Sequence, residues 1–274
     1  MKKIYQAVIR ACRKKDLPGI REISSLIWDG DDYLADVAEE WIRDGHFYLA
    51  EYEGKVVGTD KLTILPDRVG WLEGLRVHPD YQKHGIGKQL SEYGMQEALK
   101  LKHTGEVDKI EFCTFYKNKE SISMAEKIGF RVVDSLYLLT RSVSSRKQVP
   151  EKMKITESLL KDFGLYLPWG WKSVHNTPAG RKWLIEHGQG YTHDGVDFYI
   201  GGLEPIAVIP HLDERRLLVV MPALNHLFSK RGEIDILIPG KRSDLIPMLK
   251  KHRFHFWCKP EEPNMLIYRL FSGN

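Results

Sequence analysis

Residues 72–90, LEGLRVHPDYQKHGIGKQL, form the most informative stretch of this chain. The stretch opens with an apolar run that contains one carboxylate, Glu73, and that stops at Pro79. A Q-x-x-G-x-G pattern follows, and the residues after Gly87 have helical periodicity. A glycine-rich turn between a strand and a helix places unpaired N–H groups at the helix N-terminus, where phosphate groups bind. The stretch therefore predicts a strand, a phosphate-binding loop and a helix.

The neighbouring segments predict an alternation of strands and helices. Strands are expected at residues 4–13, 46–65 (a hairpin), 70–79, 109–116 and 130–141, and helices at 17–28, 35–45, 87–105 and 119–130. The first helix is expected to be capped by Asp16. The helix from residue 87 should join parallel strands, whereas the hairpin strands should be antiparallel. The predicted fold class is α/β (α+β), with a mixed, mostly antiparallel sheet flanked by helices.

The second half of the chain repeats part of the first. Residues 110–130 align without a gap on residues 234–254, with identities at Ile110/Ile234, Lys117/Lys241, Ile122/Ile246, Met124/Met248, Lys127/Lys251 and Phe130/Phe254. This pattern favours a duplication, although any strand–turn–helix–strand resembles another. No G-x-G loop occurs at the same offset, near residues 200–214. The polar segment 142–152 predicts a boundary between domains 1–145 and 146–274.

Composition limits the possible functions. A net charge of +4, spread over both halves, does not indicate nucleic-acid binding. The chain has no 18-residue apolar run, and its first residues do not resemble a signal peptide. Three scattered cysteines favour a reducing cytoplasm and a role as buried apolar filler. No CxxC or HxxxH spacing indicates a metal site. We expect a cytoplasmic monomer or homodimer that binds neither nucleic acid nor membrane.

The order strand, V-x-P-x-x-Q-x-x-G-x-G, helix resembles the acetyl-CoA pyrophosphate motif of the GNAT superfamily of N-acetyltransferases. The element order of residues 4–141 also resembles that fold, and the repeat implies a second, degenerate GNAT-like domain. A dinucleotide-binding fingerprint would need a third glycine, and a P-loop would need GK[ST]. Short strings such as LEGLRV and DDYL, with the tandem second half, also resemble the histidine N-acetyltransferase-like proteins.

The resemblance implies acetyl-CoA as cosubstrate, no metal, and a primary amine of a small molecule or amino acid as acceptor. A protein N-terminus or lysine is the alternative acceptor. A non-catalytic acyl-CoA-binding sensor and a CoA-independent scaffold are the alternative classes. The resemblance assigns the backbone of one strand to the pantetheine arm, namely Leu75, Arg76 and Val77. It assigns the loop to the pyrophosphate: Gln82, Lys83, His84, Gly85, Ile86, Gly87 and Lys88. Asn118 lies where the family often contacts the pantetheine arm.

Glu73 is the candidate general base. An amine is an ammonium ion at neutral pH and must lose a proton before it attacks a thioester. Strand alternation predicts Glu73 on the same face as Leu75 and Val77. The alternative is that Glu73 forms an ion pair with Arg76 or another cation.

Three other features bear on the expected reaction. The family often has a tyrosine at the position of Ala125, and Tyr116, His84 or water would have to replace this acid. Asp32 and Tyr33, in an acidic loop, are candidate acceptor-binding residues, with helix capping as the alternative for this loop. The aromatic segment 166–180 either closes over the acceptor or packs in the interior.

Overall fold

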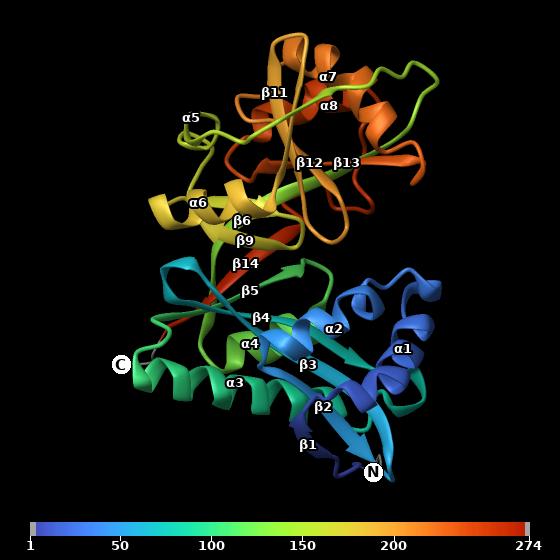
Figure 1. Cartoon of the computed structure of the whole chain (residues 1–274), viewed down its shortest axis with the longest axis vertical. Helices are drawn as coiled ribbons and strands as arrows, with labels where there is room; N and C mark the ends of the chain where they lie inside the picture. The colour runs from blue at the N-terminus through green and yellow to red at the C-terminus, as the bar shows by residue number, and fades with distance from the viewer. Residues whose placement is uncertain (1–3, 272–274) are drawn as a thin grey trace. The chain divides into compact units, whose positions relative to one another are not determined.

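The computed structural model describes residues 4–271 (Figure 1). It divides into two compact units, Met1–Phe112 and Cys113–Asn274, called unit 1 and unit 2 below. Residues 113–145, which the sequence assigns to the first domain, belong to unit 2. The functional domain boundary near residue 145 stays a prediction.

Unit 1 has the predicted mixed sheet. Its strands, in chain order, are β1 (Val8–Ala11), β2 (Phe47–Tyr52), β3 (Lys55–Leu65), β4 (Val69–Val77) and β5 (Lys109–Phe115), the last of which crosses the unit border. Their spatial order is the same as their chain order. The pairs β1–β2, β2–β3 and β3–β4 are antiparallel, and β4–β5 is parallel. The expectations of an antiparallel hairpin and of a parallel crossover are confirmed.

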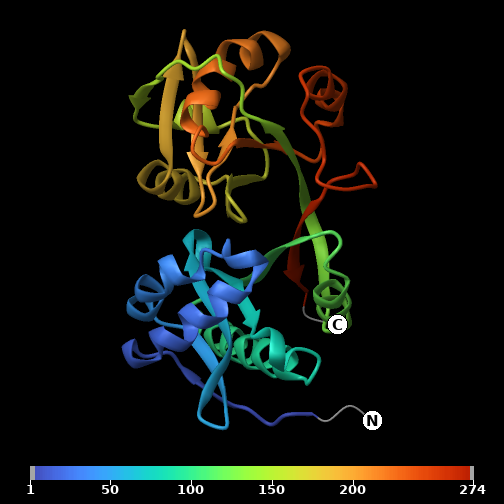
Figure 2. The same ribbon diagram turned by 90° about the vertical axis from the view of Figure 1, so that its right-hand side faces the viewer.

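Helices cover both faces of this sheet. They are α1 (Leu17–Leu26), α2 (Leu34–Asp44) and α3 (Ile86–Thr104). Apolar side chains of α1 and α2, among them Ile20 and Trp41, pack with Phe47 and Leu49 of β2. On the opposite face, Ile86 and Leu90 of α3 pack with Ala50 and Val57. Figure 2 shows α3 and the α1–α2 pair on opposite sides of these strands.

One predicted cap is wrong in its detail. Asp16 occupies the residue before α1, but its side chain does not cap that helix. Its carboxylate accepts hydrogen bonds from the Arg10 guanidinium at 2.8 Å and from the Arg13 N–H at 2.8 Å. The charge of Arg10 competes successfully for the carboxylate because a charged donor forms a stronger hydrogen bond than a helical amide.

Seven strands of unit 2 pair with one another in a mixed arrangement. These strands in chain order are β6 (Phe130–Ser142), β7 (Glu151–Met153), β10 (Gln189–His193), β11 (Val196–Gly201), β12 (Ile206–Val208), β13 (Glu233–Pro239) and β14 (Met265–Leu270). Their spatial order is β14-β6-β13-β12-β11-β10-β7. A separate hairpin joins β8 (Tyr166–Trp169) to β9 (Lys172–His175). The helices are α4 (Lys119–Lys127), α5 (Glu157–Leu160), α6 (Pro178–His187), α7 (Glu214–Leu227) and α8 (Ile246–Lys251).

The strand pairing of unit 1 recurs in unit 2. The pairs β7–β10, β10–β11 and β11–β12 are antiparallel, and β12–β13 is parallel. The helix α7 connects the parallel pair, as α3 does in unit 1. The strand β13 begins 124 positions after β5, since residue 233 minus residue 109 is 124. This recurrence supports the duplication that the sequence predicts.

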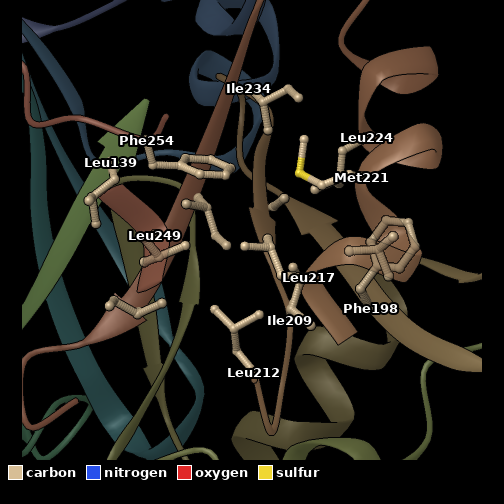
Figure 3. Close-up of a cluster of buried hydrophobic side chains, with 14 of the residues drawn as sticks. Leu139, Phe198, Ile209, Leu212, Leu217, Met221, Leu224, Ile234, Leu249 and Phe254 are labelled. Carbon is tan, nitrogen blue, oxygen red and sulfur yellow. The ribbon is translucent and has the colours of Figure 1, made fainter. Parts of the chain in front are cut away.

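The core of unit 2 lies between α7, α8 and the sheet. Figure 3 shows side chains of α7, among them Leu217, Met221 and Leu224, directed toward Ile209 and Ile234. All of these side chains are buried. The helix α7 is therefore held to its sheet by apolar contacts.

Candidate functional site

The strand β4 contains a β-bulge at Gly74. Thr59 pairs with Arg76, and Lys61 pairs with Glu73, so two steps along β3 match three along β4. Gly74 has a φ of +71°, and a Cβ there would lie 2.6 Å from the Trp41 ring. A glycine is required at this position because a side chain would be strained and would collide.

The bulge changes which side chains share a face. Arg76 and Glu73 lie opposite Thr59 and Lys61, which point to the same side of β3. Leu75 and Val77, by contrast, pack in the cluster with Ile86 of α3. The prediction that Glu73 shares a face with Leu75 and Val77 is therefore wrong, because simple alternation does not hold across a bulge.

Glu73 is half-buried and held from the neighbouring strand. Its Oε1 atom accepts a hydrogen bond from Thr63 Oγ1 at 2.5 Å. Burial raises the pKa of Tyr33 to about 12, and the negative charge of Glu73 acts in the same direction. The positive charge of Arg76 opposes both effects on the pKa of Tyr33.

The side chain of Arg76 in β4 binds the loop between α1 and α2. Its Nε and Nη2 atoms donate to the two carboxylate oxygens of Asp32, each at 3.1 Å. The guanidinium carbon lies 4.4 Å from the Trp28 ring centroid and 5.4 Å from that of Tyr33. The Asp32 side chain is fully buried. The carboxylate expected to bind a cationic acceptor therefore already has an internal cation, and the role of Asp32 stays a prediction.

The glycine-rich loop ends at an uncapped helix. Gly85, with a φ of +85°, is the residue before α3, and no side chain caps the helix there. The first turn contains no acidic residue, while Lys83 and Lys88 are exposed. The first amides of a helix lack acceptors within the helix. The N-terminus of α3 thus combines open amides, the positive end of the helix dipole and two lysines, a combination that fits a pyrophosphate.

The segment before β1 contacts this loop through hydrogen bonds and ring stacking. The Tyr5 N–H donates to the His84 carbonyl at 3.0 Å. The side chain of Gln89 accepts from the Ala7 N–H at 3.1 Å and donates to the Tyr5 carbonyl at 2.7 Å. The Tyr5 ring stacks on His84 at 4.2 Å and on Tyr52 at 4.5 Å. Sequence reasoning missed Tyr5 and Gln89, because no local pattern shows that two such distant residues meet.

Gln82 contributes a side-chain contact as well as its place in the loop. Its Nε2 atom donates to the Val77 carbonyl at 3.1 Å, which joins the loop to the end of β4. Lys88 forms a 3.6 Å ion pair with Glu92, and both side chains are exposed. Such an exposed pair contributes little to stability, so Lys88 can exchange it for a bound phosphate.

A buried carboxyl group lies between β3 and α3. Asp60 is 4% exposed, and a Cβ at Gly94 of α3 would lie 2.1 Å from its Oδ2 atom. Burial raises the pKa of Asp60 well above its ordinary value, and the charge of Glu73 adds to this effect. In the sequence, the only indication of this buried carboxyl group is an aspartate at position 60, in a strand (residues 55–65) that also contains several apolar residues.

Two further predicted positions belong to unit 2. Asn118 precedes α4 and caps it, because its Oδ1 accepts from the Ser121 N–H at 3.3 Å. Ala125 is buried in α4. The Tyr116 hydroxyl donates to the Pro260 carbonyl at 3.1 Å, and burial raises its pKa to about 12. The replacement for the missing family acid is not identified by these contacts.

Within residues 4–271, no group of three or more His, Cys, Asp or Glu side chains is arranged to hold a metal ion. Of the helices that these residues form, none has the length and apolar character needed to cross a membrane.

The geometry of β4, the loop and α3 agrees with a family assignment. Residues 17–130 match the Acetyltransferase (GNAT) family. The matched residues include the bulged strand, the glycine-rich loop and the whole of α3. Over these residues the chain is similar to the GNAT family, as the sequence motif predicts.

One curated protein is similar to part of the chain. Mycothiol acetyltransferase from Thermomonospora curvata is 27% identical over 112 residues, which cover 40% of this chain. The match spans only 36% of the length of that relative.

Solved structures resemble the chain over nearly its whole length. A GCN5-related N-acetyltransferase from Sphaerobacter thermophilus aligns with a TM-score of 0.65 at 11% identity, covering 96% of this chain and 95% of its own. A protein from Thermoplasma acidophilum aligns with a TM-score of 0.61 at 19% identity, covering 97% of this chain and 100% of its own. At these identities the likeness concerns the fold. The predicted fold class, with a second domain after the first, is confirmed.

Proposed function

We propose that the chain is an acetyl-CoA-dependent N-acetyltransferase that acts on a primary amine of a small molecule or amino acid. The observation that carries the proposal is the uncapped N-terminus of α3, which directly follows the bulged strand β4. This arrangement suits a ligand that has a pyrophosphate at one end and an extended, amide-containing arm.

The chain would hold acetyl-CoA mainly through its backbone. The amides of residues 82–88, with the charges of Lys83 and Lys88, would bind the pyrophosphate. Backbone groups of Leu75, Arg76 and Val77 would bond to the pantetheine arm, as an added strand would. Asn118 is proposed as a further contact for this arm.

Glu73 would act as the general base. It would accept a proton from the acceptor ammonium, directly or through a water molecule. The amine nitrogen then forms a bond to the thioester carbonyl carbon, the carbon–sulfur bond breaks, and the leaving thiolate takes up a proton. Since a thiol has an ordinary pKa of about 8.5, the thiolate can leave without a dedicated acid. This property is compatible with alanine at position 125.

The acceptor would be bound near Tyr33, with Asp32 acting through Arg76. The name of the curated relative, mycothiol acetyltransferase, supports acetyl transfer as the reaction class. A protein N-terminus or lysine side chain is the alternative acceptor. A non-catalytic sensor is the alternative class, favoured by Ala125 where the family often has its acid.

Two measurements on the full chain test the proposal. Calorimetry should detect acetyl-CoA binding, and a panel of amino acids, polyamines and peptide N-termini should release CoA thiol with at least one member. Tight binding with no turnover on any member would favour the sensor. The absence of binding would overturn the cofactor assignment itself.

A further inference from the structure

One peptide unit of the glycine-rich loop decides whether a phosphate would meet a donor or an acceptor. This unit joins His84 to Gly85, so it contains the His84 carbonyl and the Gly85 N–H. In a planar trans peptide these two groups point in opposite directions. A flip of the unit would therefore replace the N–H with a carbonyl oxygen, which repels an anion. Gly85 has a φ of +85° and no Cβ, so its own backbone does little to prevent such a flip.

The segment before β1 holds this peptide unit in the orientation that the structure shows. The Tyr5 N–H donates to the His84 carbonyl at 3.0 Å. Because that carbonyl points toward the segment, the N–H at the other end of the unit points away from it. A flip would break this hydrogen bond, and the broken bond would oppose the flip.

The side chain of Gln89 fixes the segment in turn. Its Oε1 accepts from the Ala7 N–H at 3.1 Å, and its Nε2 donates to the Tyr5 carbonyl at 2.7 Å. A residue of a parallel strand forms the same pair of bonds with its neighbour. The Nε2 also donates to the Gly85 carbonyl at 3.2 Å. Gln89 therefore contacts both the segment and the glycine at which a flip would occur.

Ring stacking joins the same segment to the loop and to the sheet. The ring centroid of Tyr5 lies 4.2 Å from that of His84 and 4.5 Å from that of Tyr52, the last residue of β2. A Cβ at Gly85 would lie 3.3 Å from the Cγ2 atom of Ile4, so the segment covers the glycine closely. The position of the segment thus depends on contacts with three parts of unit 1: β2, the loop and α3.

We infer that Gln89 is a positioning residue for the pyrophosphate of acetyl-CoA. It acts through residues 5–7 and keeps the peptide unit between His84 and Gly85 in its present orientation, with the N–H directed away from the segment. The inference rests on the proposed function, which places the pyrophosphate at the N-terminus of α3. Donors that are already oriented increase affinity, because binding does not have to supply the free energy of orienting them. In this role Gln89 contacts the loop and not the ligand.

The variant Gln89→Met tests the role, because it removes both hydrogen-bonding groups and keeps an unbranched side chain of similar length. Calorimetry on the full chain measures the dissociation constants of acetyl-CoA and of S-acetylpantetheine, which has the thioester arm but no pyrophosphate. We expect about tenfold weaker binding of acetyl-CoA and a change of less than about twofold for S-acetylpantetheine. A merely structural role would lower the thermal midpoint without this selectivity.

The matched control is Gln96→Met, at an exposed position of the same helix. Both dissociation constants should equal those of the parent. Circular dichroism and thermal melting show whether each variant is folded.

A second pair of variants tests the hydrogen bond from the backbone. Tyr5→Ala removes the ring and keeps the N–H, whereas Tyr5→Pro removes both. Acetyl-CoA should bind about fivefold more weakly to Tyr5→Pro than to Tyr5→Ala, which is the loss expected for one hydrogen bond. Equal affinities of these two folded variants would overturn the proposed action through the Tyr5 N–H.

The inference and the proposed function fail in different ways. If the parent binds no acetyl-CoA, the proposed function fails, and the inference fails with it. If the parent binds acetyl-CoA and folded Gln89→Met binds it equally well, the inference alone fails. Equal weakening of acetyl-CoA and S-acetylpantetheine would also overturn the inference, because the effect would then lie outside the pyrophosphate site.

Discussion

The N-termini of α3 and α7 occupy the same place in two copies of one topology, but they differ in chemistry. In both, the helix joins a strand to its parallel neighbour. Gly85 before α3 leaves the first amides open. Asp213 before α7 accepts the Arg216 N–H at 2.7 Å, and Glu214 occupies the first turn. The Asp213 carboxylate satisfies an amide, and both carboxylates repel a phosphate.

The contact between the helix and its sheet is also more polar in unit 1 than in unit 2. In unit 2, apolar side chains of α7 such as Leu217 and Leu224 pack in the core cluster with those of the sheet (Figure 3). In unit 1, Gly94 of α3 leaves room for the buried carboxyl of Asp60. The strand before α7, β12, is a short buried apolar segment, whereas β4 contains Glu73 and a bulge. In this comparison the open helix N-terminus and the buried carboxyl group lie in unit 1, whereas the matching positions of unit 2 have a capped helix and apolar packing.

The largest expected effect is that of Glu73→Gln. If Glu73 is the base, kcat should fall by about a hundredfold to ten-thousandfold, because the amide accepts no proton at neutral pH. The measurement is steady-state release of CoA with the best amine of the panel. Glu40→Gln, on the exposed side of α2, is the control and should retain the parent kcat. An unchanged kcat in Glu73→Gln would remove the main catalytic difference between the units.

The next effect tests the helix N-terminus directly. Gly85→Asp gives α3 the capping residue type of α7, and acetyl-CoA affinity should fall about a hundredfold through charge repulsion. Gly85→Asn has nearly the same shape and also tolerates a positive φ, so it should lose less than about tenfold. Calorimetry gives both dissociation constants. Equal losses in the two variants would mean that shape and not charge matters at this position.

The reciprocal change at α7 should affect stability alone. Asp213→Ala removes the cap and should lower the free energy of unfolding by about 1 kcal/mol. The hydrogen bond from the Arg216 N–H is the main cause of the lowered pKa of Asp213. The stabilisation is therefore present above the ordinary aspartate pKa and is lost as the pH falls through the lower folded value. Denaturant melts at several pH values measure it, and a change in acetyl-CoA affinity would contradict the division of roles.

The smallest effect concerns the buried carboxyl of unit 1. Because burial raises the pKa of Asp60, the folded state keeps a proton that the unfolded state loses as the pH rises above the ordinary aspartate pKa. Asp60 should therefore cost stability progressively as the pH rises through this window. Asp60→Asn should make the thermal midpoint less dependent on pH and higher than that of the parent at neutral pH. A difference that shrinks as the pH rises would contradict the prediction.

Much of unit 1 could be predicted because its patterns are local. The predicted crossover helix, residues 87–105, lies within one residue of α3 at both ends. The face of Glu73 was predicted wrongly, since the bulge depends on Gly74 fitting against Trp41, a contact between distant segments. The position of a glycine shows that a bulge is possible, but only the packed structure shows which strand contains it.

Side-chain partners were the least predictable part of the site. In the sequence, Asp32 is a candidate for binding the acceptor. In the structure, its carboxylate forms an ion pair with Arg76. Asp16 suggested a cap, whereas Arg10 binds it. A carboxylate takes the charged partner that the fold brings near, and one sequence does not contain that information.

The pairing of Gly94 with Asp60 restricts how these two positions can change. Glycine in the middle of a helix costs about 1 kcal/mol relative to alanine. Alanine at 94 would nevertheless place its Cβ against the Asp60 carboxyl, so a gain in helix propensity is blocked while the aspartate remains. Replacement of Asp60 by a smaller residue would open that route. In a library of random variants, substitutions of Gly94 should therefore survive mainly in chains that have first lost the Asp60 side chain.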